Sequence, residues 1–414
     1  MAVSLVFMIL ALLTGIFRLM SDNGLVTGVL SSLYTFHPII MVFGFLASIV
    51  MTERVAGLSV IPGLNKSSNI ASAMVPLTVL GVVAELIGYT LSISQVRYLG
   101  GGLLFAGSVS FIYVLLCLSG KTGIKLPFFY MILSVVSLTV SAILSAFELP
   151  LGQNGFIMLL LSFPIIFILG ERVELTRFTW KAASKLRFKV ALGVASISVA
   201  LFAFGSLPLE QDVHEYFVSI GSASLFLAFL LILLAENQNF KLLAKSPLPL
   251  QRYVSTHTRL AYTWGMVGMV LAEFYIFRPS SFDFYDPFIH SLAVGFIGTM
   301  LLAHGPVILP SIAGRKIQIG KFALVPLILL TVGNCVRIAG DIMLEVIPGQ
   351  VASYVLRAVV GLSGWFILAA VLIFLGRMLI SNNKGTTLAS TSAVGTMRGS
   401  EKNSRPKSSL AKSP

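Results

Sequence analysis

Charged residues are scarce in this chain. Asp, Glu, Lys and Arg make up 11% of its 414 residues, whereas soluble proteins carry about 25%. Apolar residues make up 56%, and apolar runs of about 20 residues, enough for a helix to cross a bilayer, recur along almost its whole length. This composition excludes a soluble globular protein and predicts an all-α integral membrane protein. We therefore attribute the formal net charge of +13 to topology and expect no nucleic-acid partner.

Cysteine is equally rare. Cys117 and Cys335 lie in different apolar runs and form no CxxC pair, which excludes a cysteine-based metal or redox motif. We expect both to be small buried apolar residues. The first 22 residues lack a basic start and a small-residue cleavage site, so the first apolar run is predicted to be a retained helix rather than a signal peptide.

About twelve membrane-spanning helices are predicted within a single domain, residues 1–380. They cover residues 3–20, 28–51, 69–92, 98–118, 127–148, 155–170, 187–207, 213–235, 259–277, 288–309, 323–345 and 353–376. Alternate loops differ sharply in charge, because one set, together with the C-terminal tail, holds 24 of the 29 Lys and Arg residues. By the positive-inside rule, this predicts a multi-pass plasma-membrane protein with both termini in the cytoplasm.

The last segment, residues 381–414, differs in composition from the rest. It is rich in Ser, Thr, Lys and Gly and has almost no large apolar residue, so it cannot bury a core and is predicted to be a disordered, basic cytoplasmic tail. Its charges could contact anionic lipid or simply be solvated.

Two histidines in the tenth predicted span draw attention to a possible site. His290 and His304 are 14 residues apart, which brings both to within roughly 40° of one helix face and separates them by roughly 21 Å, one near each side of the membrane. His37, followed by Pro38, lies in span 2 at a depth similar to that of His290. These rings are either wetted or satisfied core histidines, or ligands for haem or copper.

The other two histidines extend this grouping. His214 opens span 8 on the outer side, where we expect an exposed interfacial residue. His257 stands in a basic loop just ahead of span 9, either solvated or paired with His304. The five histidines thus form an outer group (37, 214, 290) and an inner pair (257, 304).

Buried charges form a second set of candidates. Arg337 and Asp341 in span 11 are four residues apart on one helix face and are expected to form an ion pair. Alternatively, Arg337, or Arg357 in span 12, could bind a haem propionate. Glu85 and Glu273 are the other ionisable residues predicted within spans.

Several stretches resemble the NnrS family of haem- and copper-containing membrane proteins. The most specific is the run from His290 to Ala303, followed by Gly314-Arg315. Weaker similarities lie at Met41–Phe45 after His37, Gly170–Val173 with Thr176 and Arg177, Tyr262–Trp264 with Gly268, Cys335–Arg337 and Trp365–Ala369. The resemblance implies a twelve-helix bundle like the catalytic subunit of haem-copper oxidases, with a role in nitric oxide handling.

The chain also departs from that family. Ile39 and Ile40 stand where the family carries further ligand-type residues in its early helix, Ile312 replaces a histidine, and His304 has no counterpart. We therefore expect haem b with His37 and His290 as ligands, His304 and His257 as a weaker second site, and copper only as a possible addition. No catalytic residue or redox partner is indicated.

Two other functions remain open. A small-solute or proton transporter would line a path with His304, Glu85, Glu273, Asp341 and Arg337, although the chain shows no internal repeat of the kind that many transporters carry. A scaffold without a cofactor would have little docking surface in such short loops.

Overall fold

The chain folds as an all-α bundle. The computed structural model describes residues 2–25, 36–58, 65–146, 153–177, 181–277, 282–313, 321–346 and 350–380. Within these ranges there is no β-strand, and twelve helical stretches are long and apolar enough to cross a membrane. The predicted all-α, multi-pass architecture is therefore confirmed. The predicted tail, residues 381–414, lies outside the described residues.

The helical segments follow the predicted order closely. They are α1 (Ala2–Asp22), α3 (His37–Ile39), η1 (Ile40–Ala47), α4 (Ser48–Leu58), α5 (Asn65–Thr90), α6 (Ser94–Thr122), α7 (Leu126–Ala146), α8 (Gln153–Thr176), α9 (Ala182–Gly205), α10 (Gln211–Ala244), α11 (Pro249–Phe277), α12 (Phe282–His290), η3 (Ser291–Gly298), α13 (Thr299–Ala313), η4 (Lys321–Leu324), α14 (Val325–Val346) and α15 (Gln350–Ile380). The second and tenth spans are unusual, because each contains an eight-residue π-helix, η1 or η3, between two α-helical segments.

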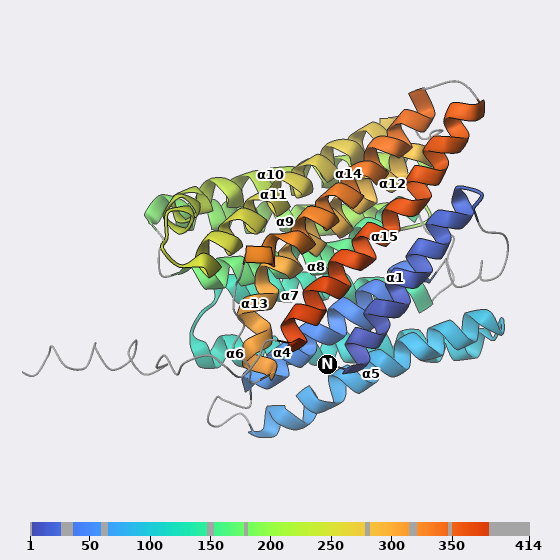
Figure 1. The fold of residues 1–414 in the computed structure, drawn as a ribbon. Helices are drawn as coiled ribbons and strands as arrows, with labels where there is room; N and C mark the ends of the chain where they lie inside the picture. The colour runs from blue at the N-terminus through green and yellow to red at the C-terminus, as the bar shows by residue number, and fades with distance from the viewer. Residues whose placement is uncertain are drawn as a thin grey trace, which may run out of the picture.

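Consecutive helices pack side by side. The close pairs are α5 with α6, α7 with α8, α9 with α10, and α14 with α15, as expected for antiparallel helices joined by short loops. The first helix, α1, closes the bundle by packing against both η1 and α15 (Figure 1). The N-terminal and C-terminal spans thus lie together beside the second span.

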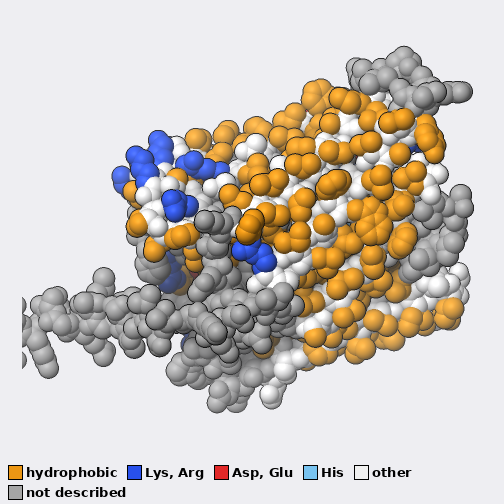
Figure 2. Space-filling model, viewed as in Figure 1, with side chains coloured by type: hydrophobic (Ala, Val, Ile, Leu, Met, Phe, Trp, Pro, Cys, Tyr) orange, Lys and Arg blue, Asp and Glu red, His pale blue; other side chains and the backbone are white. Residues whose placement is uncertain are grey.

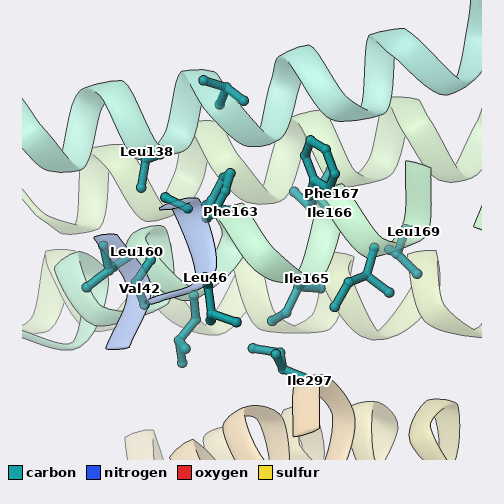
Figure 3. Packing of buried hydrophobic residues seen from close by; sticks show 14 of the residues in the cluster. Val42, Leu46, Leu138, Leu160, Phe163, Ile165, Ile166, Phe167, Leu169 and Ile297 are labelled. Carbon is teal, nitrogen blue, oxygen red and sulfur yellow. The ribbon is translucent and has the colours of Figure 1, made fainter. Parts of the chain in front are cut away.

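The centre of the bundle is α8. Buried positions make up 89% of its most apolar stretch, against 33–61% for the other spans, and a helix that is apolar on every side belongs inside a bundle. Figure 3 shows its Ile165 packed near Leu46 of η1 and Ile297 of η3. The two π-helices therefore contact the same central helix.

The surface has the character expected of a membrane protein. In Figure 2 apolar side chains cover the long sides of the face shown, whereas Lys and Arg gather at one end. Exposed basic residues at this basic end include Lys181, Lys185, Arg187, Lys189, Lys241, Lys245, Arg252 and Arg259. The start of α1 and the end of α15 lie toward the same end (Figure 1).

Several helices extend beyond their predicted ends and therefore include charged residues that were predicted to lie in loops. Arg54 and Arg172, predicted in loops, lie within α4 and α8, where both make ion pairs. Because α11 already begins at Pro249, His257 is a fully buried helical residue rather than part of a basic loop. Cys335 is exposed on the bundle surface, contrary to the prediction of a buried thiol.

Candidate functional site

An elongated cavity of about 300 Å³ lies inside the bundle. Residues from α1, the second span, α8, the tenth span, α14 and α15 line it, and most of them are aliphatic or aromatic. Six ionisable side chains interrupt this apolar wall: His37, Glu53, Glu171, His290, His304 and Arg337. An apolar cavity with a few convergent polar groups is the usual form of a small-molecule site, at about 300–1,000 Å³.

The six ionisable residues form two groups. His37, His290 and Arg337 make up what we call the histidine end, and Glu53, Glu171 and His304 make up the carboxylate end. Within each span the two groups are separated by 14 to 16 residues, which corresponds to roughly 20 Å along a helix. The cavity therefore runs along the bundle, with a polar group at either end.

His37 is held in one orientation by α1. Its Nδ1 donates a hydrogen bond to the carbonyl oxygen of Ala11, at 2.8 Å. Because a carbonyl only accepts, the lone pair of the neutral ring lies on Nε2. Gly15 makes room for the ring, since a Cβ at that position would lie 2.7 Å from Cε1 of His37.

His290 is oriented in a similar way from its own helix. Its Nδ1 lies 3.0 Å from the carbonyl oxygen of Asp286 and 3.1 Å from the Asp286 carboxylate. A carboxylate behind a ring nitrogen fixes the tautomer and raises the basicity of the other nitrogen. Neither His37 nor His290 forms a hydrogen bond through Nε2 within the described part of the chain. Both rings line the same cavity.

Arg337 completes the histidine end. It forms two hydrogen bonds to Asp286, from Nε to Oδ2 and from Nη2 to Oδ1, the latter at 2.8 Å. The predicted ion pair of Arg337 with Asp341 is therefore wrong. Arg337 pairs instead with Asp286, at the start of the tenth span, whose carboxylate accepts two hydrogen bonds from the guanidinium in a bidentate geometry. Arg357 is exposed and donates to Ser353, so it does not belong to the cavity.

The two π-helices adjoin this end. η1 begins at Ile40, directly after the His37-Pro38 segment, and η3 begins at Ser291, directly after His290. π-helical turns are rare and are frequent at functional sites. The 14-residue spacing of His290 and His304 predicts a shared face if the span is a regular α-helix. Although eight of those residues are π-helical, both rings still line the same cavity.

The carboxylate end was missed from the sequence. Arg54 of α4 binds two carboxylates of α8, Glu171 at 3.0 Å and Glu174 at 3.2 Å, and Glu53 interacts electrostatically with Arg54. Glu171 and Glu174 stand one helical turn apart, directly after a long apolar run. That spacing was the available signal, because it presents two carboxylates on one face.

His304 lies at this same end of the cavity. Only 5% of it is exposed, and its Nε2 has no hydrogen-bond partner among the described residues. Nearby, Arg172 of α8 donates to Glu236 of α10 at 2.6 Å, and Tyr262 of α11 donates to the other oxygen of Glu236 at 3.1 Å. The ion pair and the Tyr262 hydrogen bond together join three helices, and the side chains of Arg172 and Glu236 have almost no contact with solvent.

The remaining candidates lie outside the cavity. His257 is buried, its Nδ1 donates to the carbonyl oxygen of Tyr253, and it does not line the cavity. His214 is half-buried at the start of α10. Glu85 and Glu273, which a transport path would need, are also absent from the wall. Of the predicted site residues, the structure thus brings together His37, His290 and Arg337 at one end and places His304 at the other.

No three-ligand metal site is formed within the described ranges, since no three His, Cys, Asp or Glu residues there are grouped closely enough to hold an ion. The two imidazoles of the histidine end are a donor set that suits an iron already held by a macrocycle. They do not by themselves suit a free metal ion that needs three or four protein ligands.

Sequence comparison places the chain in a family. A family model described as "Domain of unknown function (DUF8744)" matches residues 1–382. The chain belongs to the DUF8744 family. The matched region of DUF8744 ends close to residue 380, where the predicted tail begins. Among curated proteins, no sequence matches the chain.

Proposed function

We propose that this DUF8744 chain is a haem-binding integral membrane protein that handles a small diatomic molecule such as nitric oxide, or transfers electrons. Haem b is the proposed cofactor, bound at the histidine end by His37 and His290. The observation that supports it is the pair of imidazoles from two distant spans that line one cavity, each with Nδ1 occupied by a hydrogen bond and Nε2 left as the ligating atom.

The surroundings fit a flat macrocycle. Gly298 lines the cavity, and a Cβ placed there would come no closer than 3.5 Å to a neighbouring atom, so its backbone is open to a planar group. The remaining guanidinium nitrogen of Arg337, Nη1, donates no hydrogen bond to the described residues and suits a propionate. A bound haem would supply iron that can exchange electrons, and with both histidines as ligands the binding of a diatomic molecule would require one of them to be displaced.

The same resemblance to the NnrS family supports nitric oxide as the diatomic and copper as a further metal to be tested. We also propose that the basic end faces the cytoplasm of a plasma-membrane protein, so that both termini are cytoplasmic, because exposed Lys and Arg concentrate there.

Replacing Gly15 with alanine is expected to weaken haem binding about tenfold. The added Cβ would lie 2.7 Å from the His37 ring and would force the ring to shift. Losing the group that orients a metal ligand typically lowers metal affinity 10–100-fold. Haem content per protein, measured by titration of the purified chain, checks this. The control is Gly102→Ala in α6, where a Cβ meets no atom within 4 Å. Equal haem content in both variants would contradict the role of Gly15.

The deciding experiment is a reduced-minus-oxidised visible spectrum of the purified chain, with a pyridine haemochrome assay and copper analysis. We expect a b-type haem signal, and copper content would show how far the NnrS resemblance extends. A preparation that stays colourless and metal-free after haem is supplied during expression would overturn the proposal. It would favour transport of a small solute instead.

A further inference from the structure

Among the described residues, the carboxylate end of the cavity has more negative than positive charge. Three carboxylates, Glu53, Glu171 and Glu174, surround the single guanidinium of Arg54. The neighbouring guanidinium, Arg172, is already paired with Glu236. An uncompensated carboxylate inside a membrane is costly, and two that share one site cannot both stay ionised. Within the described residues, the excess negative charge therefore requires either a further cation or a bound proton.

Among the described residues, the charged or titratable groups around this cluster lie on six neighbouring helices. They are Glu53 and Arg54 on α4, Glu171, Arg172 and Glu174 on α8, Glu236 on α10, Tyr253, His257 and Tyr262 on α11, and His304 on α13, with Arg377 of α15 interacting with Tyr253. No further cation among the described residues pairs with Glu53, which accepts no hydrogen bond from them.

A bound metal cation is a poor solution here. Within the described ranges no three His, Cys, Asp or Glu residues come together to hold one, and the guanidinium of Arg54 already occupies the space between Glu171 and Glu174. A proton needs no such ligand set.

His304 provides an independent sign of a ligand. Its Nε2 is buried without a hydrogen-bond partner in the described part of the chain, and the ring lines the same cavity as Glu53 and Glu171. An unsatisfied buried imidazole is costly, and imidazole accepts and releases protons near neutral pH. Glu and His in series are typical of proton relays in membranes.

We propose that the carboxylate end is a proton-binding site that is loaded from the basic end of the bundle. Side-chain exposure falls from 27% at Glu174 to 10% at Glu171, so Glu174 is the group in contact with solvent. A proton taken up there binds a carboxylate oxygen of Glu53 or Glu171. It can then move as H⁺ to the unprotonated ring nitrogen of the neutral His304 imidazole, and no electron donor is needed.

This inference goes beyond the proposed haem function and does not depend on it, because the two ends are roughly 20 Å apart. It identifies the side from which protons enter the cavity, which is the basic end, opposite to the histidine end. Any cavity chemistry that consumes protons would draw them from that side.

Infrared spectroscopy of the purified full chain in lipid at neutral pH tests the proposal. We expect the carbonyl band of a protonated carboxylic acid that shifts in D₂O. Glu53→Gln should remove it, because Arg54 can then compensate Glu171 and no excess buried carboxylate is left to hold a proton. Glu171→Gln should also remove it, because Arg54 is then free to pair with Glu53. Glu174→Gln should retain the band and slow its exchange into D₂O.

The control is Glu215→Gln, which alters an exposed carboxylate hydrogen-bonded to Gln211 and should leave the band unchanged. A wild-type protein without the band would overturn the proposal, even if the cluster variants failed to fold. So would a band that persists in a folded Glu53→Gln protein. The haem spectrum of each variant is recorded separately, so that loss of haem and loss of the proton site are distinguished.

Discussion

Substituting alanine for His290 is expected to remove nearly all bound haem. Loss of an outer-shell partner alone costs about 10–100-fold in metal affinity, and His290 is a proposed ligand with its Nε2 directed to the cavity and its Nδ1 fixed by Asp286. Haem content should therefore fall to below about a tenth of the wild-type value. His37→Ala should have the same effect. The measurement is the haem-to-protein ratio of the purified variants.

Two matched histidine variants make this result specific. His214→Ala changes a half-buried histidine at the start of α10, and His257→Ala changes a fully buried one in α11, and neither residue lines the cavity. Both should keep their haem. Full haem occupancy in His290→Ala, or equal loss in all four variants, would count against the proposed ligands.

Breaking the ion pair between Arg172 and Glu236 is expected to destabilise the bundle strongly. Their side chains are 4% and 0% exposed and lie 2.6 Å apart. Arg172→Met would leave a carboxylate buried without its counter-charge. Removing one partner of such a pair typically costs about 3–5 kcal/mol. Unfolding of the purified protein in detergent, followed by circular dichroism against temperature or denaturant, measures the loss.

A double variant separates the lost charge from lost packing. Arg172→Met combined with Glu236→Gln removes both charges and keeps an oxygen to accept the hydrogen bond from Tyr262. Most of the stability should return, because a buried ion pair replaced by uncharged groups is often neutral. If the double variant were as unstable as Arg172→Met, packing around the long arginine side chain would be the main contribution instead.

The spans were predictable because the bilayer dictates them. About 20 apolar residues are needed to cross it, and the apolar runs of the sequence coincide with the twelve candidate spans of the structure. Helix ends were less predictable, because a charged residue that ends an apolar run in the sequence can still lie within the helix when it forms an ion pair with a residue of another helix. Arg54 and Arg172 both do so, with partners 117 and 64 residues away in the sequence.

The site was predictable only in part. His37 and His290 line one interior cavity, and their similar depth in two spans could be inferred from the sequence. Pairing across helices is not. The sequence offered Asp341 as the nearest partner for Arg337, whereas the fold supplied Asp286 from another span. The carboxylates of Glu53 and Glu171 come together only once α4 packs near α8.

The π-helical segments have a consequence for comparing DUF8744 sequences. A π-helix holds an extra residue relative to an α-helix over the same turns, so deleting one residue within 40–47 or 291–298 would restore α-helical hydrogen bonding there. The helical turns on either side would keep their orientation, because the π-helix absorbs the extra residue locally. A one-residue alignment gap in either segment should therefore mark family members in which that span is a regular α-helix.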